Sequence, residues 1–392
     1  MRKTESNPVE NIPMAVLRRF GVNRLLLFLT ATLTLAGSPF ASLAAEASHF
    51  VGVAKVDITP DYPVRLSGYG NRRAEHEGVE QHIYAKALAI GGDADGPAIL
   101  LTVDNCGVPA WIRNELVKRL VSKTQVTDER VALSSSHTHC APMLAGVLPN
   151  LFGMDIPGEH VPAIERYTRE LTDKIEQVAL AALADRKPAQ LAWGIGKVGF
   201  AANRRGRLLQ PVDHELPVLR VTSPDGKVRA IFTSYACHCT TIGIEKIHGD
   251  WAGCAQEALE REFPGAVALT ALGCGADQNP NPRRPMELVV QYGEALAAET
   301  KRLAMEKLTP INGALECRVK QIDLAFDKLP SREEWQALAA SKTPATAYHA
   351  KKNLARLDRA TTGFGFATNI RRSATRGSAS SWSRVEKKSF RR

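Results

Sequence analysis

Short apolar runs alternate with long amphipathic segments through residues 50–326 of this 392-residue chain. The short runs have the two-residue alternation or the β-branched content of strands, and the long segments carry apolar residues at helical spacing. Strands that alternate with helices pack in layers, with the helices covering a sheet. We therefore predict an α/β fold: a layered α/β/α domain around a mixed β-sheet, with active-site loops at the strand ends.

The spacing of apolar residues and the positions of turn and capping residues predict where the helices and strands begin and end. Ser331 and Glu334 form a capping box that begins one helix. The segment 91–97 superficially resembles a calcium loop, but it lacks the ligand spacing and the closing glutamate, which favours a hairpin turn. Helices are predicted over 109–123, 159–184, 251–263, 286–308, from 331 and over 345–357, and strands over 50–60, 82–90, 98–103, 131–133, 191–200, 217–221, 228–235, 266–272 and 315–326.

The beginning of the chain has the features of an export signal. Arg18, Arg19 and Arg24 precede the apolar run 25–36, and small residues follow it. The run is too short to predict a membrane span, and an uncleaved amphipathic anchor is the alternative. We expect residues 1–47 to be the export signal and the mature protein to be periplasmic or secreted.

The positive charge lies at the two ends of the chain. Residues 1–24 and 361–392 together carry the whole formal net charge of +10. The near-neutral part between them predicts no basic groove, so we expect no nucleic-acid partner. Residues 361–392 are rich in Ser, Arg and Gly and predict a basic disordered tail. The folded domain is expected over 48–360, and the change of composition near Ala360 suggests a truncated or out-of-frame ending.

Two histidines, His137 and His139, follow the apolar run 131–133. Residues two apart on a strand point to the same face, so both imidazoles are expected to point in one direction. Two such imidazoles suit a divalent metal, or one metal ligand beside one acid/base group. An isolated His-x-His is at least as often a surface pair without a ligand, so the interpretation depends on other polar loops.

Three polar loops follow predicted strands, and we expect them to converge: 135–143, 237–250 and 273–280. In such a site His137 and His238 can bind zinc, and His139 can exchange protons or stabilise an oxyanion. Asp250 or Asp277 can orient an imidazole. Zinc lowers the pKa of bound water to about 7 and polarises a carbonyl, which suits the hydrolysis of amides or esters.

The chain has seven cysteines, an odd number for an exported protein, so at least one is unpaired within the monomer. Five of them flank the predicted site loops. Thiol chemistry through Cys237, Cys239 and Cys274 is one interpretation. Burial as small apolar side chains is the interpretation that we favour.

Five short motifs stand in a fixed order along the chain: Val56-Asp57-Ile58-Thr59-Pro60 with Gly68-Tyr69, Ser136-His137-Thr138-His139-Cys140-Ala141-Pro142, Asn203-Arg204-Arg205, His238 followed by Gly249-Asp250, and Gly275-Ala276-Asp277-Gln278-Asn279-Pro280. In this order they resemble the N-terminal catalytic domain of the neutral/alkaline non-lysosomal ceramidase family. The resemblance extends over about residues 50–320.

The resemblance implies roles for individual residues. His137 and His238 would be zinc ligands, His139 would lie near the scissile carbonyl, and Arg204 would be a polar contact to substrate. The family hydrolyses an N-acyl amide with zinc-activated water and releases a fatty acid and an amine such as sphingosine. The expected partner is therefore a small amphiphilic amide, with at most transient contact with a membrane surface.

The chain departs from the family pattern in two places. Alignment of the family turn Asn-x-Gly-Asp-x-Ser-Pro on Asp277 and Pro280 places Cys274 at its Asn and Asn279 at its Ser. An amide side chain hydrogen-bonds but does not attack as a hydroxyl does. The family also takes a Glu and a Tyr ligand from a later segment, for which we find no match. The alternative function is therefore a non-catalytic or inactive metal-binding relic of that family.

Overall fold

The computed structural model describes residues 49–361 apart from Asp95, 207–209, Lys307, Asp323 and Ala325. The predicted export signal over 1–47 and the predicted basic tail beyond Thr361 lie outside the described residues. Within the described part, no helix is both long and apolar enough to cross a membrane.

Within the described residues, nine strands form one mixed sheet with the order β4-β3-β2-β1-β5-β7-β8-β9, and β11 pairs with β5. Their bounds are β1 (His49–Asp57), β2 (Tyr84–Ile90), β3 (Ala98–Val103), β4 (Val131–Ser135), β5 (Lys187–Lys197), β7 (Glu215–Thr222), β8 (Val228–Tyr235), β9 (Val267–Leu272) and β11 (Thr309–Ile311). A separate two-stranded sheet contains β6 (Ala201–Asn203) and β10 (Gln278–Pro280).

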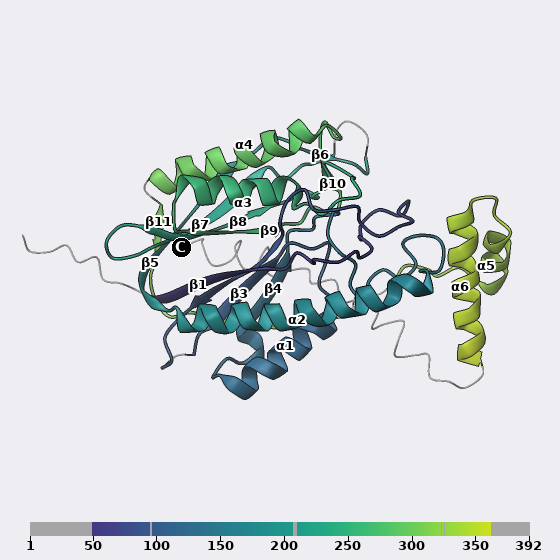
Figure 1. Ribbon diagram of the computed structural model, residues 1–392, viewed down its shortest axis with the longest axis horizontal. Helices are drawn as coiled ribbons and strands as arrows, with labels where there is room; N and C mark the ends of the chain where they lie inside the picture. Colours follow the sequence, from purple (N-terminus) through teal and green to yellow (C-terminus); the bar gives the residue numbers. More distant parts are fainter. Residues whose placement is uncertain are drawn as a thin grey trace, which may run out of the picture. The chain divides into compact units, whose positions relative to one another are not determined.

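Helices cover both outer faces of this sheet (Figure 1). The helices are α1 (Ala110–Lys123), α2 (Val161–Ala184), α3 (Asp250–Glu262), α4 (Met286–Met305), α5 (Arg332–Ala339) and α6 (Pro344–Thr361), with short 3-10 turns η1 (Asp128–Arg130) and η2 (Gly158–His160). α2 packs on β1, β2 and β3, whereas α3 packs on β9 and α4 on β5 and β7. The predicted layered α/β fold around a mixed sheet is thus confirmed.

The sheet itself folds over, so that two of its parts face each other. β1 and β5 pair over only a few residues at one end, and β9 contacts β1, β2, β3 and β4. An apolar core that includes Leu88, Leu100, Leu191 and Leu269 fills the space between these two parts. The layers therefore run helix, sheet, sheet, helix. Each buried side chain of this size stabilises the fold by about 1.5–3 kcal/mol.

Most of the predicted helices and strands are confirmed within a few residues at their ends, and the capping box at Ser331 begins α5 as expected. The predicted strand over 315–326 is wrong, because its described residues have no strand assignment and pair with no neighbouring strand. Its alternating apolar side chains are instead exposed: Val319, Ile322, Leu324 and Phe326. Alternation alone does not form a strand without a partner.

Two parallel strand pairs place the polar loops. β3 pairs with β4 and β8 pairs with β9, each in parallel register, and α1 and α3 connect the strands of each pair. Parallel strands that are joined by a helix end at the same edge of their sheet, where ligand sites commonly form. All three predicted site loops begin at these strand ends.

Candidate metal centre

The loops that follow β4 and β8 are joined by main-chain hydrogen bonds. Thr138 forms an isolated parallel bridge with Cys239, and the His139 N–H donates to the Cys239 carbonyl at 3.2 Å. The His248 N–H donates to the Cys140 carbonyl at 2.9 Å. These bonds hold the segment that contains His137 and His139 beside the segment that contains His238.

Three imidazole rings meet at this junction. The ring centroid of His137 lies 4.7 Å from that of His139 and 4.6 Å from that of His238, with edge-to-face geometry in both pairs. His137 Nε2 and His139 Nε2 are 3.1 Å apart. The predicted convergence of these three histidines is therefore seen in the structure.

The strand argument for that convergence was wrong in detail. β4 ends at Ser135, and His137 has a φ of 65°, in the left-handed region that a strand does not use. Non-glycine residues in this conformation are uncommon and occur often at functional sites. The turn at His137, rather than strand alternation, brings its ring to His139.

Backbone carbonyls fix the tautomers of two of the histidines. His137 Nδ1 lies within hydrogen-bond distance of the Cys106 carbonyl, and His238 Nδ1 is 2.6 Å from the Gly275 carbonyl. A carbonyl only accepts, so each Nδ1 carries the proton and each Nε2 carries a lone pair. Metal-binding histidines commonly have this arrangement, in which the nitrogen that does not bind the metal donates to an oxygen.

The environment keeps these imidazoles neutral. Burial lowers the pKa of His137, and burial together with the nearby charges of His137 and His238 lowers the pKa of His139 to about 2. Burial, followed by the charge of His137, lowers the pKa of His238 to about 4. Neutral imidazole is the form that binds a metal. His137 and His238 therefore have, at neutral pH, the form that binds a metal.

The residues fit a zinc ion. His137 and His238, whose ring centroids lie 4.6 Å apart, each keep a lone pair on Nε2, and imidazole nitrogen is a common zinc ligand. Cys106 joins His137 and His139 in a group whose ligand atoms all lie within 4.8 Å of one another. Cys106 was missed by the sequence analysis, because nothing in the sequence connects the end of β3 to the histidine pair.

Arg204 lies at the edge of the histidine cluster. Its Nη2 is 3.4 Å from His238 Nε2, and it donates to the Ala276 carbonyl at 2.9 Å. Its backbone N–H donates to the Asp277 carbonyl at 2.7 Å. The guanidinium is exposed to solvent, so it is accessible to a molecule that approaches the histidines.

The two predicted carboxylates do not orient an imidazole. Asp250 is fully buried, and its carboxylate accepts from the backbone N–H groups of Thr241, Ile242 and Trp251 at 2.7–3.2 Å. Asp277 accepts from the Asn203 side chain at 2.9 Å. Backbone carbonyls perform the orienting function that the sequence analysis assigned to Asp250 or Asp277. Asp250 instead holds the loop between His238 and α3.

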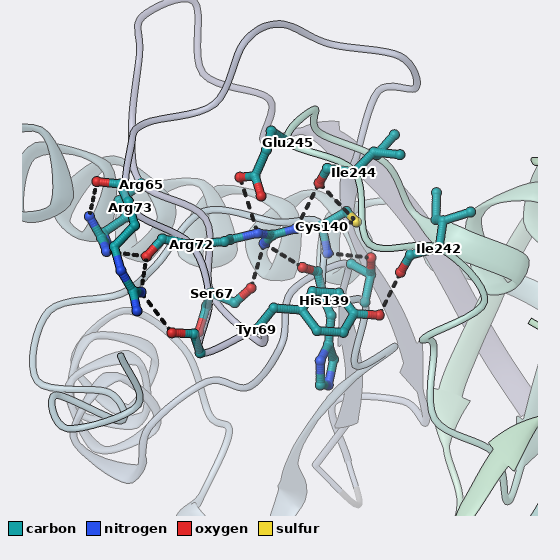
Figure 2. Close-up of polar contacts among 12 residues, drawn as sticks. Arg65, Ser67, Tyr69, Arg72, Arg73, His139, Cys140, Ile242, Ile244 and Glu245 are labelled. Carbon is teal, nitrogen blue, oxygen red and sulfur yellow. Dashed lines mark hydrogen bonds and ion pairs between the residues drawn. The ribbon is translucent and has the colours of Figure 1, made fainter. Parts of the chain in front are cut away.

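A buried arginine connects the loops behind His139 (Figure 2). Arg72 donates to the carbonyls of Ser67 and His139, both at 2.6 Å, and to the Ile244 carbonyl at 2.7 Å. Its Nε lies 3.4 Å from the carboxylate of Glu245. Three segments that are distant in sequence are thereby fixed around one guanidinium. Arg72 was also missed, because nothing in its local sequence indicates contacts with Ile244 and Glu245.

Tyr69 completes the wall beside His139. Its ring meets the His139 ring edge to face with centroids 5.1 Å apart, and its hydroxyl donates to the Ile242 carbonyl at 2.5 Å. Gly68 has a φ of 91°, and a Cβ at that position would lie 2.5 Å from the His139 side chain. Only glycine allows this close approach.

The turn that differs from the family pattern also lies beside the cluster. Asn279 is in β10, and its side-chain oxygen lies 3.4 Å from the Thr240 hydroxyl. Cys274 is exposed, Cys254 and Cys317 are partly buried, and the other four cysteines are buried as favoured. All seven cysteines are described, and all are free thiols.

Comparisons with known proteins identify the family of this chain. A family model described as "Neutral/alkaline non-lysosomal ceramidase, N-terminal" matches residues 49–273. Neutral ceramidase of Drosophila melanogaster is 24% identical over 264 residues, which cover 60% of this chain and 36% of that protein. Neutral ceramidase B of Dictyostelium discoideum is 24% identical over 270 residues, 62% of this chain and 37% of that protein. The chain thus spans little more than a third of the length of these relatives.

Solved ceramidase structures have the same fold. The crystal structure of neutral ceramidase from Pseudomonas aeruginosa matches with a TM-score of 0.59 and 20% identity, over 68% of this chain and 46% of that one. A structure titled "Ceramidase complexed with C2" matches with a TM-score of 0.58 and 19% identity. Since the family model covers more than half of the sequence, this chain belongs to the neutral/alkaline non-lysosomal ceramidase family.

Proposed function

We propose that this chain is an exported, zinc-dependent hydrolase of N-acyl amide bonds that acts on ceramide-like substrates. The proposal rests on one observation, the convergence of His137 and His238 at a junction that they share with His139. Each of the two histidines donates its Nδ1–H to a backbone carbonyl. Membership in the ceramidase family supports the amide bond as the reacting group.

His137 and His238 would hold the zinc through their Nε2 atoms, with Cys106 and His139 close to the same position. When bound, zinc lowers the pKa of water to about 7 and polarises a carbonyl oxygen. The Cys106 and Gly275 carbonyls keep the two histidine rings in the required tautomer and orientation.

His139 would stabilise the oxyanion that develops on the amide carbonyl. Its pKa of about 2, which burial lowers first, makes it a poor base near neutral pH. A neutral imidazole still has one N–H to donate. In the structure that N–H faces His137 Nε2. Engagement of His137 Nε2 as a ligand would leave the His139 N–H free to donate to substrate.

Arg204 would position the polar part of the substrate, since its exposed guanidinium stands beside His238. Asp250, which the sequence analysis predicted to orient an imidazole, would act only indirectly through the loop that it holds. We further propose residues 1–47 as a signal for export to the periplasm or the medium, and residues 48–360 as the folded domain.

The test compares zinc content and hydrolysis of a fluorescent short-chain ceramide in the purified full chain and in three variants. His137→Ala and His238→Ala are expected to lose both zinc and hydrolysis. His82→Ala removes a histidine that pairs with Asp57 on the surface and is expected to keep both. A parent protein without zinc, or equal loss in all three variants, contradicts the proposal.

A second candidate is a metal-binding protein without catalytic activity. Asn279, which stands where the family pattern has a serine, favours this function, because an amide cannot supply a nucleophilic hydroxyl. Stoichiometric zinc with no turnover of any N-acyl amide would support it. An Asn279→Ser variant that acquires turnover would locate the difference at this one side chain.

A further inference from the structure

Two arginine pairs from separate loops lie around the histidine cluster. Arg204 and Arg205 follow β6, and Arg283 and Arg284 lie between β10 and α4. These four residues are here called the arginine rim. Arg204 contacts His238, and Arg283 Nε donates at 2.7 Å to the carbonyl of Thr240, two residues further along the same loop. Both pairs are therefore attached to the segment that supplies a proposed zinc ligand.

Arg284 reaches the other side of the cluster. Its backbone N–H donates to the Thr241 carbonyl at 2.8 Å, and its φ of 105° is a strained conformation for a residue with a side chain. A Cβ built on Gly243 would lie 3.4 Å from Arg284 Nη1 and 3.2 Å from the Tyr69 ring. Arg284 is therefore close to Tyr69, whose ring packs against His139.

None of the four guanidinium groups forms an ion pair with a carboxylate among the described residues, whereas cations elsewhere on the surface, such as Arg113, Arg119, Lys246 and Arg302, are paired. The nearby carboxylate of Asp277 accepts from Asn203 and offsets part of the charge of Arg204. Four cations beside one carboxylate leave an excess of positive charge, which attracts an anion and raises its local concentration.

We propose that the arginine rim binds a carboxylate carried by the substrate, so that N-acyl α-amino acids are hydrolysed faster than neutral amides with the same acyl chain. This inference rests on the proposed function, because it places the scissile amide at the histidine cluster. The 3.4 Å between Arg204 Nη2 and His238 Nε2 favours an anion close to that amide. An α-carboxylate is separated from the amide nitrogen by a single carbon, and guanidinium groups bind carboxylates through paired hydrogen bonds.

The reaction is a hydrolysis that needs no further reactant. Water adds its oxygen to the acyl carbon, the carbon–nitrogen bond breaks, and the nitrogen takes up two protons, one from the attacking water and one from the carboxylic acid formed. The products are a fatty acid carboxylate and a zwitterionic amino acid, which together carry the single negative charge of the substrate.

The test uses two substrates that differ only in charge, N-dodecanoylglycine and N-dodecanoylglycinamide, with the full zinc-loaded chain. We expect kcat/KM for the acid to exceed that for the amide by roughly 10- to 100-fold, the range given by hydrogen bonds to charged groups. An Arg205→Ala/Arg284→Ala double variant is expected to lose most of this preference through a fall in kcat/KM for the acid. Lys227→Ala, which removes a surface cation on the β7–β8 hairpin, serves as the control and is expected to change neither rate.

Equal rates on the two substrates, or a preference that survives in the double variant, would overturn the proposal. Binding of N-dodecanoylglycine by calorimetry separates this outcome from failure of the proposed function. If no amide is hydrolysed but the acid binds and the double variant loses that binding, the arginine rim stands and the catalytic proposal falls. If the double variant loses only its binding to phosphatidylserine vesicles, the rim recognises a membrane surface, which contradicts the substrate proposal.

Discussion

The part of the domain that contains β1 to β4 and the part that contains β5 and β7 to β9 are built alike but supply different chemistry. Each has a parallel strand pair joined by a helix, and each pair ends at the candidate site. In the first part the strand ends carry Cys106, His137 and His139. In the second part they carry His238 and a glycine-containing turn whose carbonyl at Gly275 orients that histidine.

This difference shows that the fold determines the position of each loop, whereas the side chains determine which candidate ligands the loop carries. Parallel strand pairs place a loop at the same position in both parts, and residues two to four positions beyond each strand supply the candidate ligands. The first part brings three candidate ligands together, and the second adds one whose ring is held by a backbone carbonyl. Neither part alone brings His137 and His238 to one ion.

The largest expected effect comes from removing one zinc ligand from each part. Removal of a residue that only hydrogen-bonds to a metal ligand weakens metal binding roughly 10–100-fold. His137→Ala and His238→Ala should each weaken zinc binding by more than this. Competition with a chromophoric chelator measures the affinity. A loss in only one variant would break the comparison, because it would mean that a single part holds the metal.

A large loss of stability is expected when Arg72 is removed. Arg72→Ala leaves three buried carbonyls and Glu245 without the guanidinium, and the free energy of unfolding should fall by about 3–5 kcal/mol. Urea denaturation measures this change. Arg73→Ala removes an exposed neighbour and should stay within about 0.5 kcal/mol of the parent. Similar values for both variants would refute the structural role of Arg72.

A matched pair of glycine variants sharpens the comparison further. In Gly68→Ala the new Cβ would lie 2.5 Å from His139, and in Gly275→Ala it would lie 2.7 Å from the Cys237 nitrogen. Each substitution should cost about 1–3 kcal/mol of stability, as overpacking commonly does. The first should displace His139 and leave zinc bound, whereas the second should displace His238 and weaken zinc binding. Zinc titration of both folded variants distinguishes these outcomes.

The most gradual expected effect is a pH dependence of stability in the metal-free protein. The pKa of His238 is about 4 when folded, because burial lowers it, against about 6.5 when unfolded. Between these values the unfolded chain binds more protons, so the unfolding free energy should fall as the pH falls from about 6.5 to about 4. Burial also lowers the pKa values of His137, His139 and His248, so His238→Gln should make that part of the curve shallower, but not flat, in denaturation at graded pH. An unchanged slope would show that His238 is not buried as a neutral ring.

The sequence was a good guide wherever local pattern decides structure. Apolar spacing predicted the helices and most strands, since their burial faces are periodic, and the approach of His238 to His137 followed from polar residues at strand ends. It failed over 315–326, where alternation without a partner strand leaves Val319 and Phe326 exposed. Whether a neighbouring strand exists is not a local property.

The site residues that were missed are those that act through long-range contacts. Arg72 contacts the Ile244 carbonyl across 172 positions of sequence, and Cys106 approaches His137 across 31. The predicted role of Asp250 shows the converse. A carboxylate near a histidine in sequence suggested orientation of its ring, but three backbone N–H groups are closer and take both of its oxygens.

The long reach of Arg72 has a consequence for how the protein is made. During synthesis Arg72 leaves the ribosome long before Ile244 and Glu245. Its guanidinium therefore stays hydrated while β1 and β2, which flank it in sequence, are already able to pair. Contacts between such distant segments form late, because closing a long loop costs entropy before the contacts are gained. We therefore expect the wall behind His139 to close late in folding, after synthesis of the segment that contains Ile244 and Glu245.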